Sequence, residues 1–343
     1  MSTPFDDLAA FDDIIDARSP GEFAVDHIPG AINLPVLDDA ERARVGTLHK
    51  QASAFEAKKL GAALVARNIA QHLDAWFAGK PKDYRPLVYC WRGGNRSGSL
   101  THVLQKIGFA AVQLDGGYKA YRRHVVGELE RLPAQFGFRV VLGPTGSGKS
   151  RLLQALAAVG AQVLDLEALA AHRGSLLGDL PGQPQPSQKS FESSIWARLR
   201  RFDPARPVFV ESESKKIGSL QVPEALIRAM RSSPSLRLEV PLAARVALLI
   251  EDYAHFLDDP ATVNARLAHL ATLRGRETVA AWQALSHQRA WPALVTALLA
   301  QHYDPAYLKS LSHNYAPSPA DRTLSLDDVS PDGLLRVARA LVD

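Results

Sequence analysis

Short apolar runs alternate with longer helical patterns through the first part of the chain. Val88 and Tyr89 close one such run, and Cys90 follows it directly. Apolar side chains at 60, 64, 69 and 73 recur at the spacing of one helix face. Strands that alternate with helices are typical of a parallel α/β sheet. The predicted strands cover 13–16, 31–34, 86–89 and 111–114, and the predicted helices cover 52–76, 97–107 and 122–130.

A second α/β pattern follows the segment 132–137, whose proline and glycine make it the best interdomain boundary. We therefore predict an N-terminal domain over 1–132 and a C-terminal domain over 133–343, the latter with a helical C-terminal extension. Its predicted strands cover 138–142, 162–164, 207–210 and 236–240, its first helix covers 149–158, and residues 243–299 are mostly helical by pattern.

Length and composition agree with two domains of an ordinary globular protein. The chain has 343 residues, a formal charge of +4 and a pI of about 9.1. Such a charge permits an anionic partner without requiring one. No apolar run reaches the roughly 18 residues that a membrane span needs, and the acidic N-terminus lacks the layout of a signal peptide. We expect a cytoplasmic protein without a membrane partner.

The single cysteine, Cys90, lies in a loop between a predicted strand and a predicted helix. A lone cysteine is usually an inert buried residue, but the neighbours of this one favour reactivity. A helix N-terminus presents backbone N–H groups, Gly93 and Gly94 permit a tight cradle, and Arg92 and Arg96 add positive charge. These features lower a thiol pKa and favour a thiolate, persulfide or perselenide. We therefore predict Cys90, Arg92 and Arg96 as catalytic residues.

The spacing of Cys90 and Arg96 also occurs in protein phosphatases, so residues outside the loop decide between the two families. Segments 15–23 and 26–35 closely resemble the rhodanese signature. This resemblance implies a rhodanese-like parallel-sheet domain over 1–132. It also implies mainly structural roles for four polar residues of these segments, namely Asp16, Arg18, Glu22 and His27.

Residues 143–150 match the phosphate-binding pattern G-x-x-x-x-G-K-[ST] in full. They follow a predicted strand and open a predicted helix, which is the context that this motif requires. The second domain is therefore expected to be a P-loop NTPase-like α/β domain, and a nucleotide or a diphosphate without a base fits the loop equally well. The predicted phosphate-binding residues are Gly143, Thr145, Gly146, Ser147, Gly148, Lys149 and Ser150.

A P-loop usually works with an acidic residue at the end of a neighbouring strand, which orients Mg²⁺ or a water molecule. Two predicted strands end in such residues. Acidic residues are also common at ordinary loop starts, so each is only a candidate. The candidates are Asp165, Glu167, Glu211 and Glu213.

The combination of these two domains resembles the tRNA 2-selenouridine synthase family over nearly the whole chain. The segments that carry the resemblance are 41–51, 89–97, 116–120, 165–192, 211–218 and 303–307. The resemblance implies replacement of the sulfur of wobble 2-thiouridine by selenium, with selenophosphate as donor. It further implies an S-geranyl intermediate formed from geranyl diphosphate, so that the P-loop holds a diphosphate and need not hydrolyse ATP.

The same resemblance implies that tRNA, through its anticodon arm, is the macromolecular partner, and an enzyme that supplies selenophosphate is a second candidate partner. No firmly bound cofactor is expected, and Mg²⁺ is a candidate ion. Cys90 would accept or guide selenium, while Arg92 and Arg96 would stabilise the anionic donor. The candidate tRNA-binding residues are His172, Arg173, Gln188, Arg198 and Arg200.

The chain departs from the family at two positions. Leu48 stands where the family often has a cysteine, which puts in doubt any mechanism that needs a second internal thiol. Ser212 stands where the family often has aspartate, which leaves Glu211 and Glu213 as acidic candidates. Three alternative functions remain. The first is a rhodanese-type sulfurtransferase coupled to an ATPase or kinase module, the second is a kinase or ATPase with a regulatory rhodanese module, and the third is an RNA-binding adaptor without catalysis.

Overall fold

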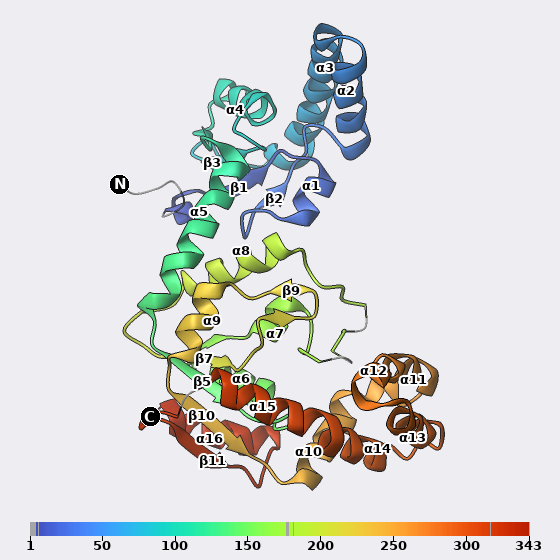
Figure 1. The fold of residues 1–343 in the computed structure, drawn as a ribbon. Coiled ribbons are helices and arrows are strands. Elements are labelled where there is room, and N and C mark those ends of the chain that lie inside the picture. The colour runs from blue at the N-terminus through green and yellow to red at the C-terminus, as the bar shows by residue number, and fades with distance from the viewer. Residues whose placement is uncertain (1–4, 6, 176–177, 181, 316, 343) are drawn as a thin grey trace. The chain divides into compact units, whose positions relative to one another are not determined.

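The structure is a computed structural model that describes residues 5, 7–175, 178–180, 182–315 and 317–342. The chain divides into two compact units, each with its own parallel sheet (Figure 1). The first unit comprises residues 1–128 and 186–197, and the second comprises 129–185 and 198–343. The predicted boundary after 132 falls within the short helix η3 (Leu132–Gln135). The predicted boundary places residues 186–197 in the second domain. Their contacts in the structure group them with the first unit instead.

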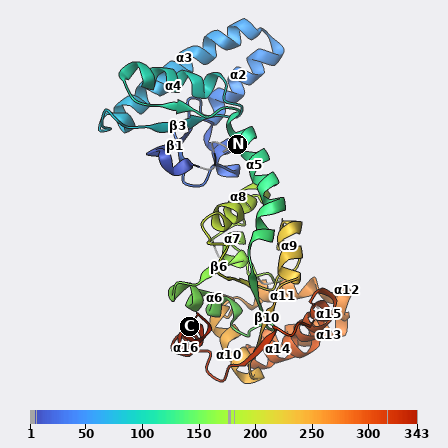
Figure 2. The ribbon, with the colours of Figure 1, turned by 90° about the vertical axis from the view of Figure 1, so that its left-hand side faces the viewer.

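The first unit contains a four-stranded parallel sheet in the order β2-β1-β3-β4. Helices α3 and α4 cover one face of this sheet, and α1 and α5 lie on the other (Figures 1 and 2). The elements are η1 (Leu8–Ala10), β1 (Asp13–Asp16), α1 (Pro20–Val25), β2 (Ile32–Asn33), α2 (Asp39–Gln51), α3 (Ala54–His72), η2 (Leu73–Phe77), β3 (Pro86–Tyr89), α4 (Asn95–Ile107), β4 (Val112–Gln113), α5 (Gly117–Arg131) and α8 (Gln188–Leu199).

Helix α8 belongs to the first unit through contacts with α5. Trp196 packs edge-on against Tyr121, with 5.7 Å between the ring centroids, and both side chains are buried. Arg122 forms an ion pair with Glu192 and donates a 3.1 Å hydrogen bond to the Ser193 hydroxyl. This helix was not predicted, and nothing in its local pattern indicates that it completes the N-terminal fold.

The second unit contains a five-stranded parallel sheet in the order β11-β10-β5-β7-β6. Helices α6 and α16 pack on one face, and α9 packs on the other (Figure 2). The elements of the sheet layer are β5 (Phe138–Leu142), α6 (Lys149–Ala158), β6 (Gln162–Leu164), α7 (Leu166–Ala170), β7 (Val208–Glu211), β8 (Lys216–Ile217), β9 (Leu220–Gln221), α9 (Glu224–Arg231), β10 (Ser235–Glu239), β11 (Arg322–Ser325) and α16 (Pro331–Val342).

A group of helices follows β10 and forms a core of its own around the buried Trp282. This confirms the predicted helical C-terminal region. No helix among the described residues is both long enough and apolar enough to cross a membrane. The helices are α10 (Leu242–Asp252), η4 (Ala254–Phe256), α11 (Pro260–Ala268), α12 (Ala271–Arg274), α13 (Arg276–His287), α14 (Trp291–Leu298), η5 (Leu299–Tyr303) and α15 (Asp304–Asn314).

The buried ion pair of Asp16 and Arg18 holds together the loops above the first sheet. The Arg18 guanidinium lies 2.6 Å from the Asp16 carboxylate, and both side chains are excluded from solvent. Arg18 also donates a 2.6 Å hydrogen bond to the Asp26 carbonyl and lies 3.9 Å from the centre of the Tyr118 ring. Its partners come from three separate segments, which gives this pair the structural role that the resemblance implied.

We predict that Arg18→Met destabilises the first unit by about 3–5 kcal/mol, because it leaves a buried carboxylate without its partner. The single thiol of Cys90 is buried in this unit, so pulsed thiol labelling across a urea series reports its unfolding. The control is Arg42→Met, which removes the exposed Arg42 from its pair with Glu22 (3.7 Å) and should cost about 1 kcal/mol or less. Equal unfolding midpoints for the two variants would contradict the prediction.

Candidate functional site

The loop after β3 places Cys90 at the N-terminus of α4. The carbonyl of Cys90 accepts a 2.8 Å hydrogen bond from the Tyr118 amide, which anchors the loop to α5. Gly117 makes this approach possible, since a Cβ atom there would lie 2.2 Å from the Cys90 carbonyl oxygen. Gly93 has a positive φ of 66°, and a Cβ atom there would lie 2.7 Å from the Leu114 carbonyl oxygen. The close approach of the Gly116-Gly117 turn to the cysteine loop therefore requires glycine at Gly93 and Gly117.

Hydrogen bonds make the Cys90 thiol more acidic in spite of its burial. The residue is only 3% exposed, and burial by itself raises the pKa of a thiol. The Ser97 hydroxyl lies 3.1 Å from Sγ, and the backbone N–H groups of Ser97 and Arg92 also point to it. Together with the charge of Arg96, these donors outweigh burial and lower the pKa of Cys90. The arrangement favours a thiolate, as the loop sequence predicted.

The two arginines of the loop have different surroundings. Arg96 forms an ion pair with Glu22 at 2.6 Å, so much of its charge is already compensated. Arg92 is exposed. Its guanidinium is therefore the better placed of the two to meet an incoming anion, while Arg96 joins the loop to α1.

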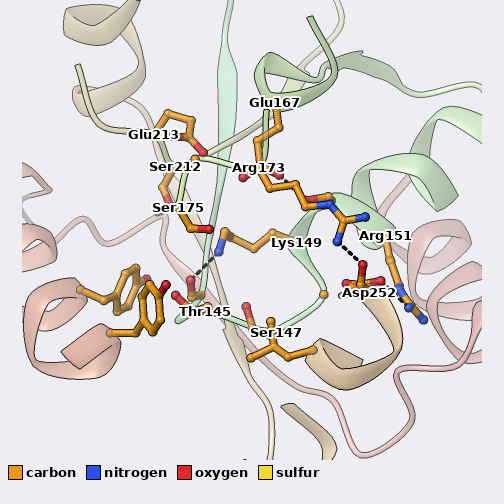
Figure 3. A pocket seen from close by; sticks show the side chains of 18 of the residues that line it. Thr145, Ser147, Lys149, Arg151, Glu167, Arg173, Ser175, Ser212, Glu213 and Asp252 are labelled. Atoms are coloured by element: carbon orange, nitrogen blue, oxygen red, sulfur yellow. Dashed lines mark hydrogen bonds and ion pairs between the residues drawn. The ribbon is translucent and has the colours of Figure 1, made fainter. Parts of the chain in front are cut away.

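The P-loop lies between β5 and α6, at the carboxyl edge of the second sheet. This edge is where ligands bind in parallel α/β sheets. All seven predicted phosphate-binding residues line one cavity of about 580 Å³. Lys149 donates a 2.8 Å hydrogen bond to the Gly143 carbonyl, and in Figure 3 it lies between the acidic side chains and Thr145 and Ser147.

Buried hydroxyl groups on this cavity, those of Ser147 and Tyr315 among them, have no hydrogen-bond partner in the part of the chain that the structure describes. Ser147 Oγ and Tyr315 Oη are both shielded from solvent. Buried polar atoms are almost always hydrogen-bonded, and unpaired ones call for a ligand, ion or water. Both residues line the P-loop cavity. The cavity is therefore suited to a ligand with several oxygen atoms.

Three of the four acidic candidates converge beside the P-loop. Glu167, Glu211 and Glu213 each offer a carboxylate oxygen within 4.8 Å of the others. Ser150 donates a 2.9 Å hydrogen bond to Glu167, and Glu211 accepts one of 3.0 Å from the Glu167 amide. Asp165 lies on the same cavity but caps α7 through the Ala168 amide (2.8 Å).

Burial and mutual repulsion raise the pKa of each carboxyl in this cluster. Glu211 is completely buried, and its pKa lies well above the usual value because of burial and then of the charges of Glu167 and Glu213. Burial and then the charge of Glu167 raise the pKa of Glu213 to about 8. Oxygen ligands in this arrangement suit a hard divalent cation such as Mg²⁺, which would relieve the repulsion. The residues present therefore fit the expected ion.

The five tRNA candidates come from both units. Arg173 lines the P-loop cavity, where it donates a 2.7 Å hydrogen bond to the Asp252 carbonyl (Figure 3). His172 also lines it, but burial lowers its pKa and its Nδ1 accepts from the Gly174 amide (3.0 Å). Arg198 and Arg200 are exposed in the second unit, whereas Gln188 begins α8 in the first unit.

Arg245 is a site residue that the sequence did not indicate. It is 6% exposed, donates a 2.9 Å hydrogen bond to the Thr145 carbonyl and pairs with Asp304 at 2.6 Å. It thereby fastens the P-loop to α10 and to α15. Its partners lie 100 and 59 residues away along the chain, so local sequence carries no signal for this role.

Comparisons with known proteins agree with this domain pair. The family described as tRNA 2-selenouridine synthase AAA domain matches residues 136–267, and the rhodanese-like domain family matches 4–124. A protein of Aeromonas salmonicida named tRNA 2-selenouridine synthase is 35% identical over 332 residues, which cover 88% of this chain and 87% of that protein. The chain belongs to the tRNA 2-selenouridine synthase family.

Other members of the tRNA 2-selenouridine synthase family match with different extents. A relative from Marinobacter nauticus is 34% identical, with 86% of this chain and 87% of the relative covered. One from Nitrosomonas europaea is 38% identical over 244 residues, and this match spans 70% of the chain but only 63% of the relative, less than two thirds of its length. The predicted family and fold class are confirmed, while the individual roles of the site residues stay predictions.

We predict that Ser97→Ala moves the reactivity of Cys90 to higher pH. The lowered pKa of Cys90 means that its reaction with iodoacetamide should have a midpoint at lower pH than that of an ordinary cysteine. Loss of the Ser97 hydroxyl removes the strongest of the interactions that oppose burial, so the midpoint should rise. Ser99→Ala, on the same helix, is the matched control and should leave it in place. A shared midpoint for both variants would refute the assignment.

We predict that protein without Mg²⁺ loses stability as pH rises from about 4.5 to about 8, because the folded state holds the Glu213 proton more tightly than the unfolded chain does. The contribution of the Glu213 proton to the free energy of unfolding is complete below this pH window and is lost above it. In calorimetric melts, Glu213→Gln should flatten the dependence on pH and weaken the stabilisation by Mg²⁺ at high pH. The exposed Glu224→Gln is the control. An unchanged slope in Glu213→Gln would count against the assignment.

Proposed function

We propose that this chain is a tRNA-modifying transferase that exchanges the sulfur of wobble 2-thiouridine for selenium through an S-geranyl intermediate. Geranyl diphosphate and selenophosphate are its small substrates, and the anticodon arm of tRNA is its macromolecular substrate. Membership of the tRNA 2-selenouridine synthase family across both units carries this proposal. The proposed location is the cytoplasm.

The first step in this proposal is alkylation of sulfur. The thiocarbonyl sulfur of the base attacks C1 of geranyl diphosphate, the C–O bond to the diphosphate breaks, and diphosphate leaves with the electron pair. The P-loop amides and Lys149 are suited to stabilise the charge that develops on this leaving group. Mg²⁺ held by Glu167, Glu211 and Glu213 would add to that stabilisation.

The second step replaces the alkylated sulfur. Selenium attacks C2 of the base, the C–S bond breaks, and geranyl thiolate departs, while water takes the phosphoryl group of selenophosphate to give phosphate. The selenide set free in this way is the nucleophile, and Cys90 is proposed to guide it to the base. Arg92 is the cation suited to the donor, since Arg96 is paired with Glu22. An S-alkylated sulfur is a better leaving group than the original thiocarbonyl sulfur.

Basic residues are expected to contact the phosphates of the anticodon arm. Arg198 and Arg200 are exposed and are proposed for this role. Arg173 is proposed to act where the RNA meets the P-loop cavity, which it lines. Contacts of this kind make binding weaker as salt concentration rises. An enzyme that supplies selenophosphate is the proposed protein partner.

The decisive measurement is mass spectrometry of nucleosides from thiolated tRNA incubated with the protein, geranyl diphosphate and selenophosphate. We expect S-geranyl and seleno nucleosides. Lys149→Ala should lower geranylation by about 100-fold or more, since a charge stabiliser of the leaving group is lost. Cys90→Ala should still geranylate and should block selenium entry.

Lys106→Ala, at an exposed position of α4, is the control for removal of a lysine and should behave as the parent does. Unchanged thiouridine with the parent protein, combined with steady phosphate release from ATP, would favour the alternative of a sulfurtransferase coupled to an ATPase or kinase. Loss of both steps in each variant would show that the two sites do not divide the chemistry in this way.

A further inference from the structure

An apolar cavity opens directly beside the P-loop cavity in the second unit. Its volume is about 80 Å³. It lies against α10, α11, α14 and η5, the helices that follow the sheet. The lining residues are Thr145, Ser175, Leu249, Ile250, Tyr253, Phe256, Leu257, Val263, Trp291, Leu294, Val295, Leu298, Leu299 and Tyr303.

Five residues line both cavities, so the two spaces share a border. They include Thr145 of the P-loop itself, together with Ser175 and Tyr303. The hydroxyls of Ser175 and Tyr253 lie 3.3 Å apart at this border. Beyond it the wall is almost entirely hydrocarbon. A molecule that reaches from one space into the other meets an anion-binding end and an apolar end.

The apolar wall follows one face of α14. Trp291, Leu294, Val295 and Leu298 are separated by the three and four residues that place side chains on the same helix face. Leu294 and Leu298 also belong to the core of the helical region. The cavity is thus built on a helix that packs into the core of this region, and its apolar character follows from the same amphipathic pattern that folds the region.

The geometry points to this cavity as the binding site for the hydrocarbon chain of a prenyl diphosphate whose diphosphate lies on the P-loop. The inference rests on the proposed geranyl diphosphate and deepens it by locating the chain. A nucleotide base is a poor occupant, because its several polar edge groups would lose water without gaining partners on a wall of leucine, isoleucine and valine. A branched hydrocarbon needs no partners there.

The size of the cavity limits how much of the hydrocarbon chain it can hold. A space of about 80 Å³ holds roughly five to eight water-sized groups at about 10–15 Å³ each, so it takes part of a ten-carbon chain, and the rest lies at the shared border. Tyr303 lies at that border, and Trp291 precedes it by twelve residues, or about 18 Å of helix. Trp291 is therefore the lining residue of α14 that is farthest from the phosphate end.

The test compares binding of geranyl diphosphate with binding of inorganic diphosphate by calorimetry on the full chain. The dissociation constant of inorganic diphosphate divided by that of geranyl diphosphate measures the affinity that the hydrocarbon chain contributes. Each buried methylene is worth about a fourfold gain in affinity, so the ratio in the parent should be large. Val295→Phe fills the cavity and should reduce this ratio at least tenfold. Ala293→Phe, exposed on the same helix and outside the cavity, is the matched control and should preserve it.

The outcomes separate this inference from the proposed function. A large ratio in the parent that Val295→Phe leaves unchanged overturns the cavity assignment while the geranyl donor stands. A parent that binds geranyl diphosphate no more tightly than inorganic diphosphate removes the donor itself. Equal weakening of both ligands leaves the ratio constant, and it likewise overturns the assignment.

A second variant provides an independent test that does not depend on filling the core. Trp291→Ala should extend the cavity and raise the affinity for farnesyl diphosphate relative to geranyl diphosphate at least tenfold. Dimethylallyl diphosphate should bind the variant and the parent alike, because its five carbons do not reach position 291. A farnesyl preference that stays the same in Trp291→Ala would overturn the assignment of the chain to this cavity.

Discussion

The hydrogen bond from Arg245 to the P-loop is the interaction on which the second unit depends. A P-loop needs several backbone N–H groups to point at one place, and its glycines do not fix that arrangement by themselves. Arg245 binds the Thr145 carbonyl and the Asp304 carboxylate at once, and it is almost fully buried. The helices after the sheet are therefore part of the phosphate site. The same attachment brings α14 and its apolar face beside the loop.

Both candidate sites use one architectural device for different chemistry. In each unit a strand of a parallel sheet runs into a glycine-containing loop, and the loop opens a helix whose free N–H groups attract negative charge. In the first unit the group concerned is the Cys90 thiol, whose thiolate form Ser97 and the loop amides favour. In the second unit a bound anion is expected to bring the charge, and the three carboxylates beside the loop are suited to a cation.

Sequence alone predicted the parts of these sites that are local in the chain. The loops at 90–97 and 143–150 hold their candidate groups in consecutive residues, and the strands β1, β3, β5 and β6 begin and end where the apolar runs do. The pairing of Arg245 with Thr145, the position of α8 and the apolar cavity depend on residues far apart in the chain. No pattern of period 2 or 3.6 encodes such contacts, because tertiary packing alone selects them.

The grouping of α8 with the first unit has a consequence for how the protein is made. The chain passes from one unit to the other at 128–129, 185–186 and 197–198. During synthesis the rhodanese-like fold emerges first, but the surface around Tyr121 stays uncovered until Trp196 leaves the ribosome. The N-terminal unit is thus completed only after the P-loop and the segments of β5 and β6 have been synthesised. Gene fragments cut at the apparent domain border would release an incomplete protein.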